Sequence, residues 1–405
     1  MHINIYNYST WINIIISVLI AILNITFNAA YYSYFLILSS LFVGYDFYRR
    51  WNNGEMIDFH FMRSIRLLFF AIVLFYGSLL VSSIMLRDVS SLNKSLWLFS
   101  LTIPMYVLYY FSSNYDIKAG FQTGVILSVI INSICGFLQL AGIYQKNIFD
   151  TDRMQGFWGH PNSMGLFMAF IVPVLFFMAV ETQRIRVKCF YFLLLLISTI
   201  CLGLSQSRGA VVSLLVGGVA GLLLLAFIER NRINAKWLTI GITSILIALA
   251  ITFSFYINVS DTRGAGERKL MWEASIEMWE DHKIVGIGMS RWKEHYYSPE
   301  YHPIGAGEKG LNMPHNMFLY FLSGAGIIGG ASYVLFSLII FVVVLQCGVA
   351  SKEIWGVLPV IIYTIFFTEG LVDSTISDKQ VALPFFAFLG YFIGMLNLNK
   401  FKKLD

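Results

Sequence analysis

The chain has 405 residues, of which 57% are apolar and 13% are charged. An ordinary soluble domain carries about twice that charged fraction, so the composition excludes a water-soluble enzyme or binding module. The net charge of +5 is small for this length, and its distribution along the chain is more informative than its total. The four cysteines form no CxxC pair, which indicates neither a disulfide nor a metal site.

Long apolar runs predict about twelve membrane-spanning helices, because lipid offers no hydrogen-bond partners to an open backbone. The spans are expected at residues 11–27, 29–45, 65–86, 95–113, 120–143, 162–180, 189–204, 209–228, 237–257, 326–348, 355–371 and 382–398. The first is expected to be retained, since no small-residue cleavage site follows it. The sequence therefore predicts an all-α polytopic membrane protein, a single transmembrane domain over residues 1–405. One large loop, residues 259–313, is expected between the ninth and tenth spans.

Basic residues are distributed unevenly between the two sets of loops. With the N-terminus placed inside, the inner loops hold fifteen Lys and Arg residues and the short outer loops hold six. Because Lys and Arg accumulate in cytoplasmic loops, this asymmetry predicts that the N- and C-termini are cytoplasmic. The 259–313 loop is then expected to face outward, into a periplasm or the cell exterior.

Arg208 and Arg268 are cations on the outer side, where the insertion rule disfavours them. Arg208 occupies a short polar turn at membrane depth, where a guanidinium needs an anionic partner. That partner is either a lipid phosphate reached by snorkelling or a bound phosphate or pyrophosphate, which suits the planar guanidinium fork. Arg268 lies on a predicted amphipathic loop helix four residues before Trp272, which predicts a half-buried, aromatic-lined position.

A turn rich in Gly and aromatic residues precedes the sixth span. Arg153 in this turn is either an interface anchor or part of a site. Asn162 follows Pro161 where the helix begins, and a role as the N-cap of that helix would account for it.

His315 is the strongest candidate for a catalytic group. It follows Pro314 where the chain re-enters the membrane, with Asn316 beside it. An imidazole is well suited to accept a proton from a sugar hydroxyl near neutral pH. The loop has no HxH, HExxH or DxD cluster, so no metal site is expected. The glycines that follow, from Gly324 to Gly330, predict either a broken helix that lines a site or close helix packing by small residues.

The same residues resemble the O-antigen ligase family of membrane enzymes. His315 and Asn316 are followed by nine residues, Gly326, two residues and Gly329, which is similar to the family signature near the end of its large periplasmic loop. Three further segments look like the family: the turn Ser207–Gly209, the pair Arg268 and Trp272, and the turn from Arg153 to Asn162. The resemblance covers the chain from about Arg153 to Gly330.

The resemblance implies a metal-independent, inverting glycosyltransferase with a GT-C-like fold and no cofactor, in the bacterial inner membrane. Its partners would be an oligosaccharide or polysaccharide donor on undecaprenyl diphosphate, a lipid A-core acceptor and membrane lipid, with no nucleic acid. By position, His315 would be the base or would orient the acceptor, and Arg208 and Arg268 would hold the diphosphate. Support would come from Arg153, Asn162, Asn316 and Trp272. The reaction would belong to lipopolysaccharide biosynthesis.

Three other functions remain open, one of which is a protein O-oligosaccharyltransferase. An O-antigen or capsule polymerase of the same superfamily shares the arginine turns and would extend one lipid-linked glycan with another. A lipid-linked glycan flippase is less favoured, because proton-coupled transporters carry acids within their spans. Here Glu369, Asp373 and Asp378 lie at the last outer turn.

Overall fold

The computed structural model describes residues 5–25, 29–54, 63–143, 153–228, 262–307, 310–351 and 354–401. Within these ranges all regular elements are helices. They are α1 (Ile5–Ile25), α2 (Ala29–Asn52), α3 (Arg63–Met85), α4 (Val89–Ser100), α5 (Ile103–Asn114), α6 (Lys118–Leu140), α7 (Pro161–Glu181), α8 (Ile185–Leu204), α9 (Arg208–Ile228), α11 (Thr262–Asp281), α12 (Trp292–Tyr296), α13 (Met317–Ser351), α14 (Leu358–Glu369) and α15 (Lys379–Phe401), with a 3-10 turn at Ile354–Val357. The predicted ninth span, 237–257, lies outside the described residues.

The described part of the chain is a bundle of apolar helices. Eight of its helical segments are long and apolar enough to cross a membrane, and two shorter apolar helices accompany them. α4 and α5 count as one such segment, Val89–Asn114, which bends at Leu101. The prediction of an all-α, multi-pass membrane protein is therefore confirmed, whereas the number of twelve spans stays a prediction.

Polar side chains gather at the end of the bundle where α2 and α5 finish. Asp46 of α2 is fully buried there and accepts hydrogen bonds from Tyr8, Tyr110 and Tyr115 at 2.6–2.7 Å. Lys118, where α6 begins, pairs with Glu181, where α7 ends, so these helix ends share the same face. The candidate site lies at the other ends of the helices, where α7, α9, α13 and α15 begin and α14 finishes.

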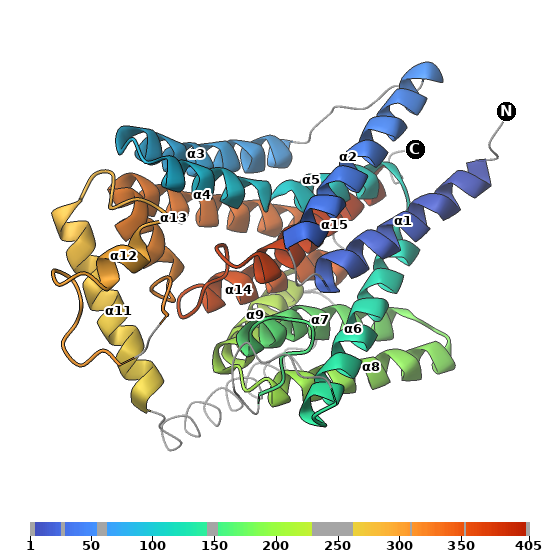
Figure 1. Cartoon of the computed structure of the whole chain (residues 1–405). Helices are drawn as coiled ribbons and strands as arrows, with labels where there is room; N and C mark the ends of the chain where they lie inside the picture. Colours follow the sequence, from blue (N-terminus) through green and yellow to red (C-terminus); the bar gives the residue numbers. More distant parts are fainter. Residues whose placement is uncertain are drawn as a thin grey trace.

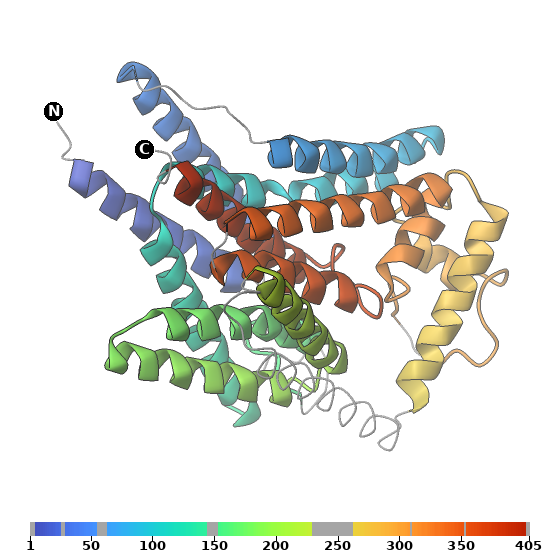
Figure 2. The same cartoon turned by 180° about the vertical axis from the view of Figure 1, so that it is seen from behind.

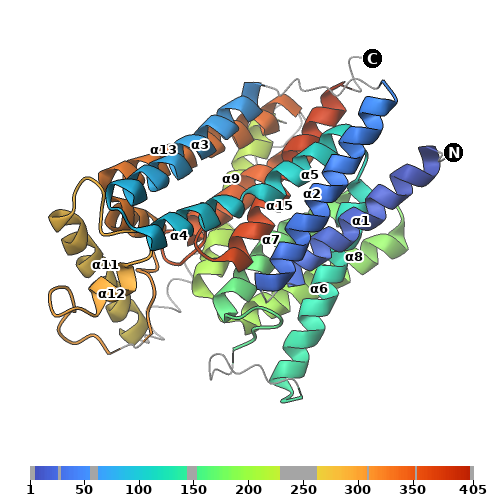
Figure 3. The same cartoon turned by 45° about the horizontal axis from the view of Figure 1, so that its top comes forward.

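α11 and α12 form a lobe that projects beyond the bundle, as all three views show (Figure 1, Figure 2, Figure 3). This lobe has a small core of its own, in which the buried Trp292 stacks on Tyr296 and donates to Ser275 Oγ at 2.9 Å. An ion pair between Arg291 and Asp88, with Nε and Oδ2 at 3.0 Å, joins the lobe to the start of α4. The 259–313 loop is thus a folded unit wherever the structure describes it.

α13 is broken, as the glycine cluster predicts. Ala325 and Gly326 leave the helical conformation, and Gly326 has φ +65. The predicted alternative in which the broken helix lines a site is wrong at this point, because loop backbone fills the break. The lobe segment from Lys283 to Gly288 occupies it: Ile327 N donates to Lys283 O at 2.8 Å, and Gly288 N donates to Gly324 O at 2.9 Å. Loop backbone therefore satisfies polar groups that the broken helix leaves unpaired.

Candidate functional site

A chain of hydrogen bonds links four polar side chains from three parts of the sequence. His315 Nδ1 lies 2.7 Å from Asp373 Oδ1, and Asn162 Nδ2 donates to Asp373 Oδ2 at 2.6 Å. Arg153 Nη2 donates to Asn162 Oδ1 at 2.5 Å. Three predicted site residues are thus brought together. Arg153 contacts Asn162 directly, and Asp373 links Asn162 to His315. Asp373, for which the sequence predicts no role, joins them.

The backbone around His315 holds its side chain in place. His315 has φ +49, a left-handed conformation that non-glycine residues seldom adopt and that is enriched at functional sites. On one side, Trp272 Nε1 donates to Pro314 O at 3.0 Å, which ties the segment to α11. On the other, Asn316 accepts from Leu319 N at 3.0 Å and so caps α13. Trp272 and Asn316 therefore act on the position of His315.

The start of α7 is organised differently from the prediction. His160, not Asn162, is the N-cap residue, because His160 Nδ1 accepts from Asn162 N at 3.1 Å. A cap needs only an acceptor at this distance, and the neutral imidazole supplies one. The Asn162 side chain is thereby left to bridge Arg153 and Asp373. Arg153 itself is tied to the α8–α9 turn, since its Nε donates to Ser205 O at 2.9 Å.

Arg208 and Arg268 stand near this chain of side chains. Arg208 begins α9 two residues after Gln206, which has φ +51, and its side chain is exposed. Arg268 is half-buried on α11. Burial lowers the pKa of Arg153, Asp373 raises it, and the charges of Arg208 and Arg268 lower it further. Arg153 is therefore close enough to both Arg208 and Arg268 to feel their positive charges, and such a concentration of positive charge attracts an anion.

The charge states of two site residues follow from their surroundings. Burial opposes ionisation of Asp373, but the hydrogen bond and charge of His315 and the amide of Ser374 outweigh it, so the pKa of Asp373 lies well below its usual range. Burial lowers the pKa of His160 to about 4. Asp373 is therefore a carboxylate and His160 a neutral imidazole at neutral pH.

Comparison with known families identifies one segment of this chain. Residues 193–334 match the family described as O-Antigen ligase. This segment is an O-antigen ligase domain. The match confirms the resemblance predicted from the sequence, and a search of curated proteins found no match. The domain indicates a membrane glycosyltransferase of the O-antigen ligase or polymerase type.

The O-antigen ligase domain contains only part of the candidate site. Arg208, Arg268 and His315 lie within the matched segment, whereas Arg153 precedes it and Asp373 follows it. Asp373 and Asp378 both contact the start of α7, the latter by accepting from Ser163 Oγ at 2.7 Å. The only sequence signal for these acids was their position at an outer turn next to a span.

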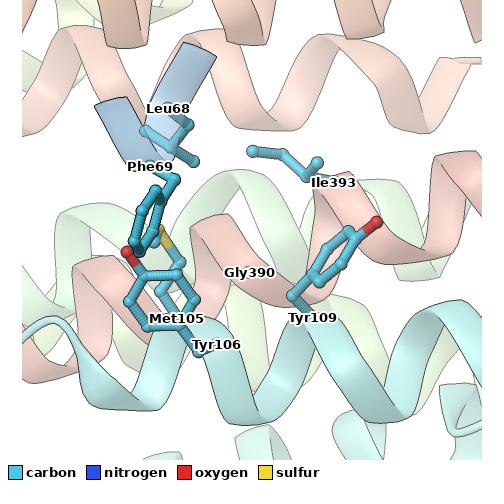
Figure 4. A pocket seen from close by; sticks show the side chains of 7 residues that line it. All are labelled: Leu68, Phe69, Met105, Tyr106, Tyr109, Gly390 and Ile393. Carbon is cyan, nitrogen blue, oxygen red and sulfur yellow. The ribbon is translucent and has the colours of Figure 1, made fainter. Parts of the chain in front are cut away.

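Two further observations bear on where chemistry can occur. An apolar pocket lies between α3, α5 and α15 (Figure 4), lined by Leu68, Phe69, Met105, Tyr106, Tyr109, Gly390 and Ile393. It has no ionisable group other than its tyrosines and shares no residue with the site of the O-antigen ligase domain. Among the described residues, no three or more His, Cys, Asp or Glu side chains are grouped so as to hold a metal ion.

Proposed function

We propose that this protein is an O-antigen ligase, which transfers a glycan from undecaprenyl diphosphate to a hydroxyl group of lipid A-core at the periplasmic face. The observation that carries this proposal is the His315–Asp373 pair beside three arginines within one cluster. An oriented imidazole suits the activation of a hydroxyl group, and a group of guanidinium ions suits a diphosphate. The O-antigen ligase domain supports the same chemistry.

His315 is proposed as the base. If its Nδ1 carries the hydrogen that bonds Asp373, the lone pair is on Nε2, which is then free to accept a proton. The carboxylate also stabilises the imidazolium that forms, as in other carboxylate-oriented histidine bases. In the reaction, the acceptor O–H gives its proton to Nε2 while its oxygen forms the new glycosidic bond. Attack from the face opposite the leaving group inverts the anomeric carbon.

Arg208 and Arg268 are proposed to bind the diphosphate, with Arg153 adding charge nearby. The bond between the anomeric carbon and the phosphate oxygen breaks, and the diphosphate leaves with the electron pair. Preorganised cations stabilise the negative charge that develops on that oxygen. Asn162 orients Arg153 and Asp373. Asn316 and Trp272 support the His315 segment.

The decisive experiment offers both acceptors to one enzyme. Purified full-length protein is incubated with a glycan on undecaprenyl diphosphate and either lipid A-core or a second lipid-linked glycan. Glycosylated lipid A-core is the expected product. Extension of the second lipid-linked glycan instead would assign the protein as a polymerase. Movement of the donor across vesicles without any transfer would assign it as a flippase and would refute the enzyme proposal.

Variants of the His315–Asp373 pair test the assigned roles. We expect His315→Ala to lower the transfer rate by about 100-fold or more, because it removes a general base. Asp373→Asn is expected to lower the rate as well. The amide NH2 of asparagine can donate to Nδ1, which leaves the hydrogen on Nε2, and Nε2 then cannot accept the proton of the acceptor hydroxyl group. His295→Ala, on α12 of the lobe, serves as the control and should retain activity. Full activity of His315→Ala would eliminate His315 as the base.

A further inference from the structure

Glu369 is a buried carboxyl group that the proposed reaction does not use. It is the last residue of α14, and it is only 2% exposed. Within the described ranges, its Oε2 atom has no hydrogen-bond partner. Buried polar atoms are almost always hydrogen-bonded, so an unpaired carboxyl oxygen at this depth stands out among the side chains of the site.

The carboxyl group of Glu369 lies against the turn that carries Arg208. A Cβ atom built on Gly209 would lie 2.5 Å from Glu369 Oε1, so only a glycine at this position lets the carboxyl group approach α9 so closely. Glu369 also lies within electrostatic range of Arg268 and Asp373. These neighbours place Glu369 inside the cluster that contains the proposed diphosphate ligands and the ion pair of the base.

The surroundings of Glu369 favour a neutral carboxyl group over a carboxylate. A buried carboxylate with an unpaired oxygen has lost its hydration without compensation, which is strongly unfavourable. Asp373, already ionised in its pair with His315, repels a second negative charge nearby. Arg268 favours ionisation, but in the described part of the chain it makes no hydrogen bond to Glu369 Oε2. A neutral carboxyl group retains a hydrogen that it can donate.

We propose that Glu369 is a further donor-binding residue, which donates its carboxyl hydrogen to an oxygen of the lipid-linked diphosphate. Glu369 lies against Gly209, the residue after Arg208, and within electrostatic range of Arg268, so a diphosphate held by the two arginines would bring acceptor oxygens near this carboxyl group. The neutral group adds a hydrogen bond without the repulsion that a carboxylate would bring. The inference rests on the proposed function but assigns Glu369 no part in proton transfer.

Two substitutions at Glu369 separate a neutral donor from a carboxylate. Glutamine keeps size, neutrality and a donor, so Glu369→Gln should retain the kcat and the donor KM of the wild type. Leucine removes the donor, and Glu369→Leu should raise the donor KM about ten-fold, with little change in kcat, as expected for loss of one hydrogen bond to a charged group. Undecaprenyl diphosphate without a glycan should inhibit Glu369→Leu less strongly by the same factor.

The matched control is Glu181, a carboxylate at the opposite end of the bundle, which pairs with Lys118. Glu181→Gln and Glu181→Leu should have equal donor KM values. Gly209→Ala keeps the Glu369 carboxyl group but displaces it, and we expect it to raise the donor KM as Glu369→Leu does. If Glu369→Leu does not fold, as judged by size-exclusion chromatography, the donor KM values of Gly209→Ala and Glu369→Gln are compared instead.

Two outcomes would overturn the inference and leave the proposed function standing. In the first, Glu369→Gln loses activity, which would mean that a carboxylate is needed. In the second, the wild type transfers the glycan, and neither Glu369→Leu nor Gly209→Ala changes the donor KM. A wild-type protein that neither binds undecaprenyl diphosphate nor transfers a glycan would instead refute the proposed function itself.

Discussion

His160 and His315 are histidines of one cluster, but their surroundings give them different roles. His160 caps a helix, whereas His315 is paired with a carboxylate. His160 is half-buried, and its Nδ1 is already used as a helix cap. His315 Nδ1 lies 2.7 Å from Asp373 Oδ1, and this contact orients the ring. Burial outweighs the nearby charge of Asp373 and lowers the pKa of His160, so its neutral form is favoured. Residue type alone therefore identifies neither role.

The lowered pKa of His160 leads to a prediction about acid stability. The folded protein binds this proton near pH 4, whereas an unfolded histidine binds it near pH 6.5. The unfolded state therefore binds more protons between these values, and stability should fall as the pH is lowered from about 6.5 to about 4. The loss attributable to His160 should be on the order of 1–3 kcal/mol.

The measurement is the thermal unfolding midpoint in detergent between pH 7 and 4.5. His160→Asn keeps a good N-cap acceptor but cannot titrate, so its midpoint should fall less steeply over this window. His295→Asn, in the lobe, should follow the wild-type curve. Identical slopes for His160→Asn and the wild type would show that His160 does not titrate as described.

At the scale of the elements, the break in α13 fastens the lobe to the bundle. Gly326 is left-handed, and a Cβ atom at this position would lie 2.6 Å from Val285 N. The helix that begins with the His315 motif and the loop that carries Arg268 are thereby held together. The glycines of the motif consequently serve the geometry of the site without touching it.

We predict that Gly326→Ala loosens the lobe. The left-handed backbone alone should destabilise the variant by about 1–3 kcal/mol, and the contact with the Val285 backbone adds to this. The variant should show faster proteolysis within α11 and lower transfer activity at an unchanged amount of folded protein. Gly77→Ala in α3, where a Cβ atom meets nothing within 4 Å, is the control. Wild-type proteolysis of Gly326→Ala would contradict the fastening role.

At the scale of the whole molecule, the site and the buried Asp46 cluster occupy opposite ends of the bundle. The ends of α2 and α5 meet at Asp46, and Lys118 meets Glu181 at the same face. The lobe projects from the other end. Because basic residues favour the cytoplasm, the lobe end is predicted to face the periplasm.

Cysteine labelling in intact cells tests this orientation. In a chain whose four native cysteines are replaced by alanine, Lys293→Cys in the lobe should react with a membrane-impermeant maleimide. Gln183→Cys, between α7 and α8, should react only after the membrane is permeabilised. Both side chains are exposed, so access to the reagent depends on the side of the membrane. The reverse pattern would invert the topology and place the site in the cytoplasm.

The sequence by itself determined the helical membrane fold and the His315 and arginine motifs. Continuous apolar runs permit only helices in lipid, and motif residues are adjacent in the chain, so local patterns suffice for both. Only the tertiary structure decided that Asp373 is the partner of His315, that His160 caps α7, and that Glu369 lies against Gly209. These contacts join helix ends that are far apart in the chain. Their pairing depends on how the helices pack, which hydrophobic periodicity does not encode.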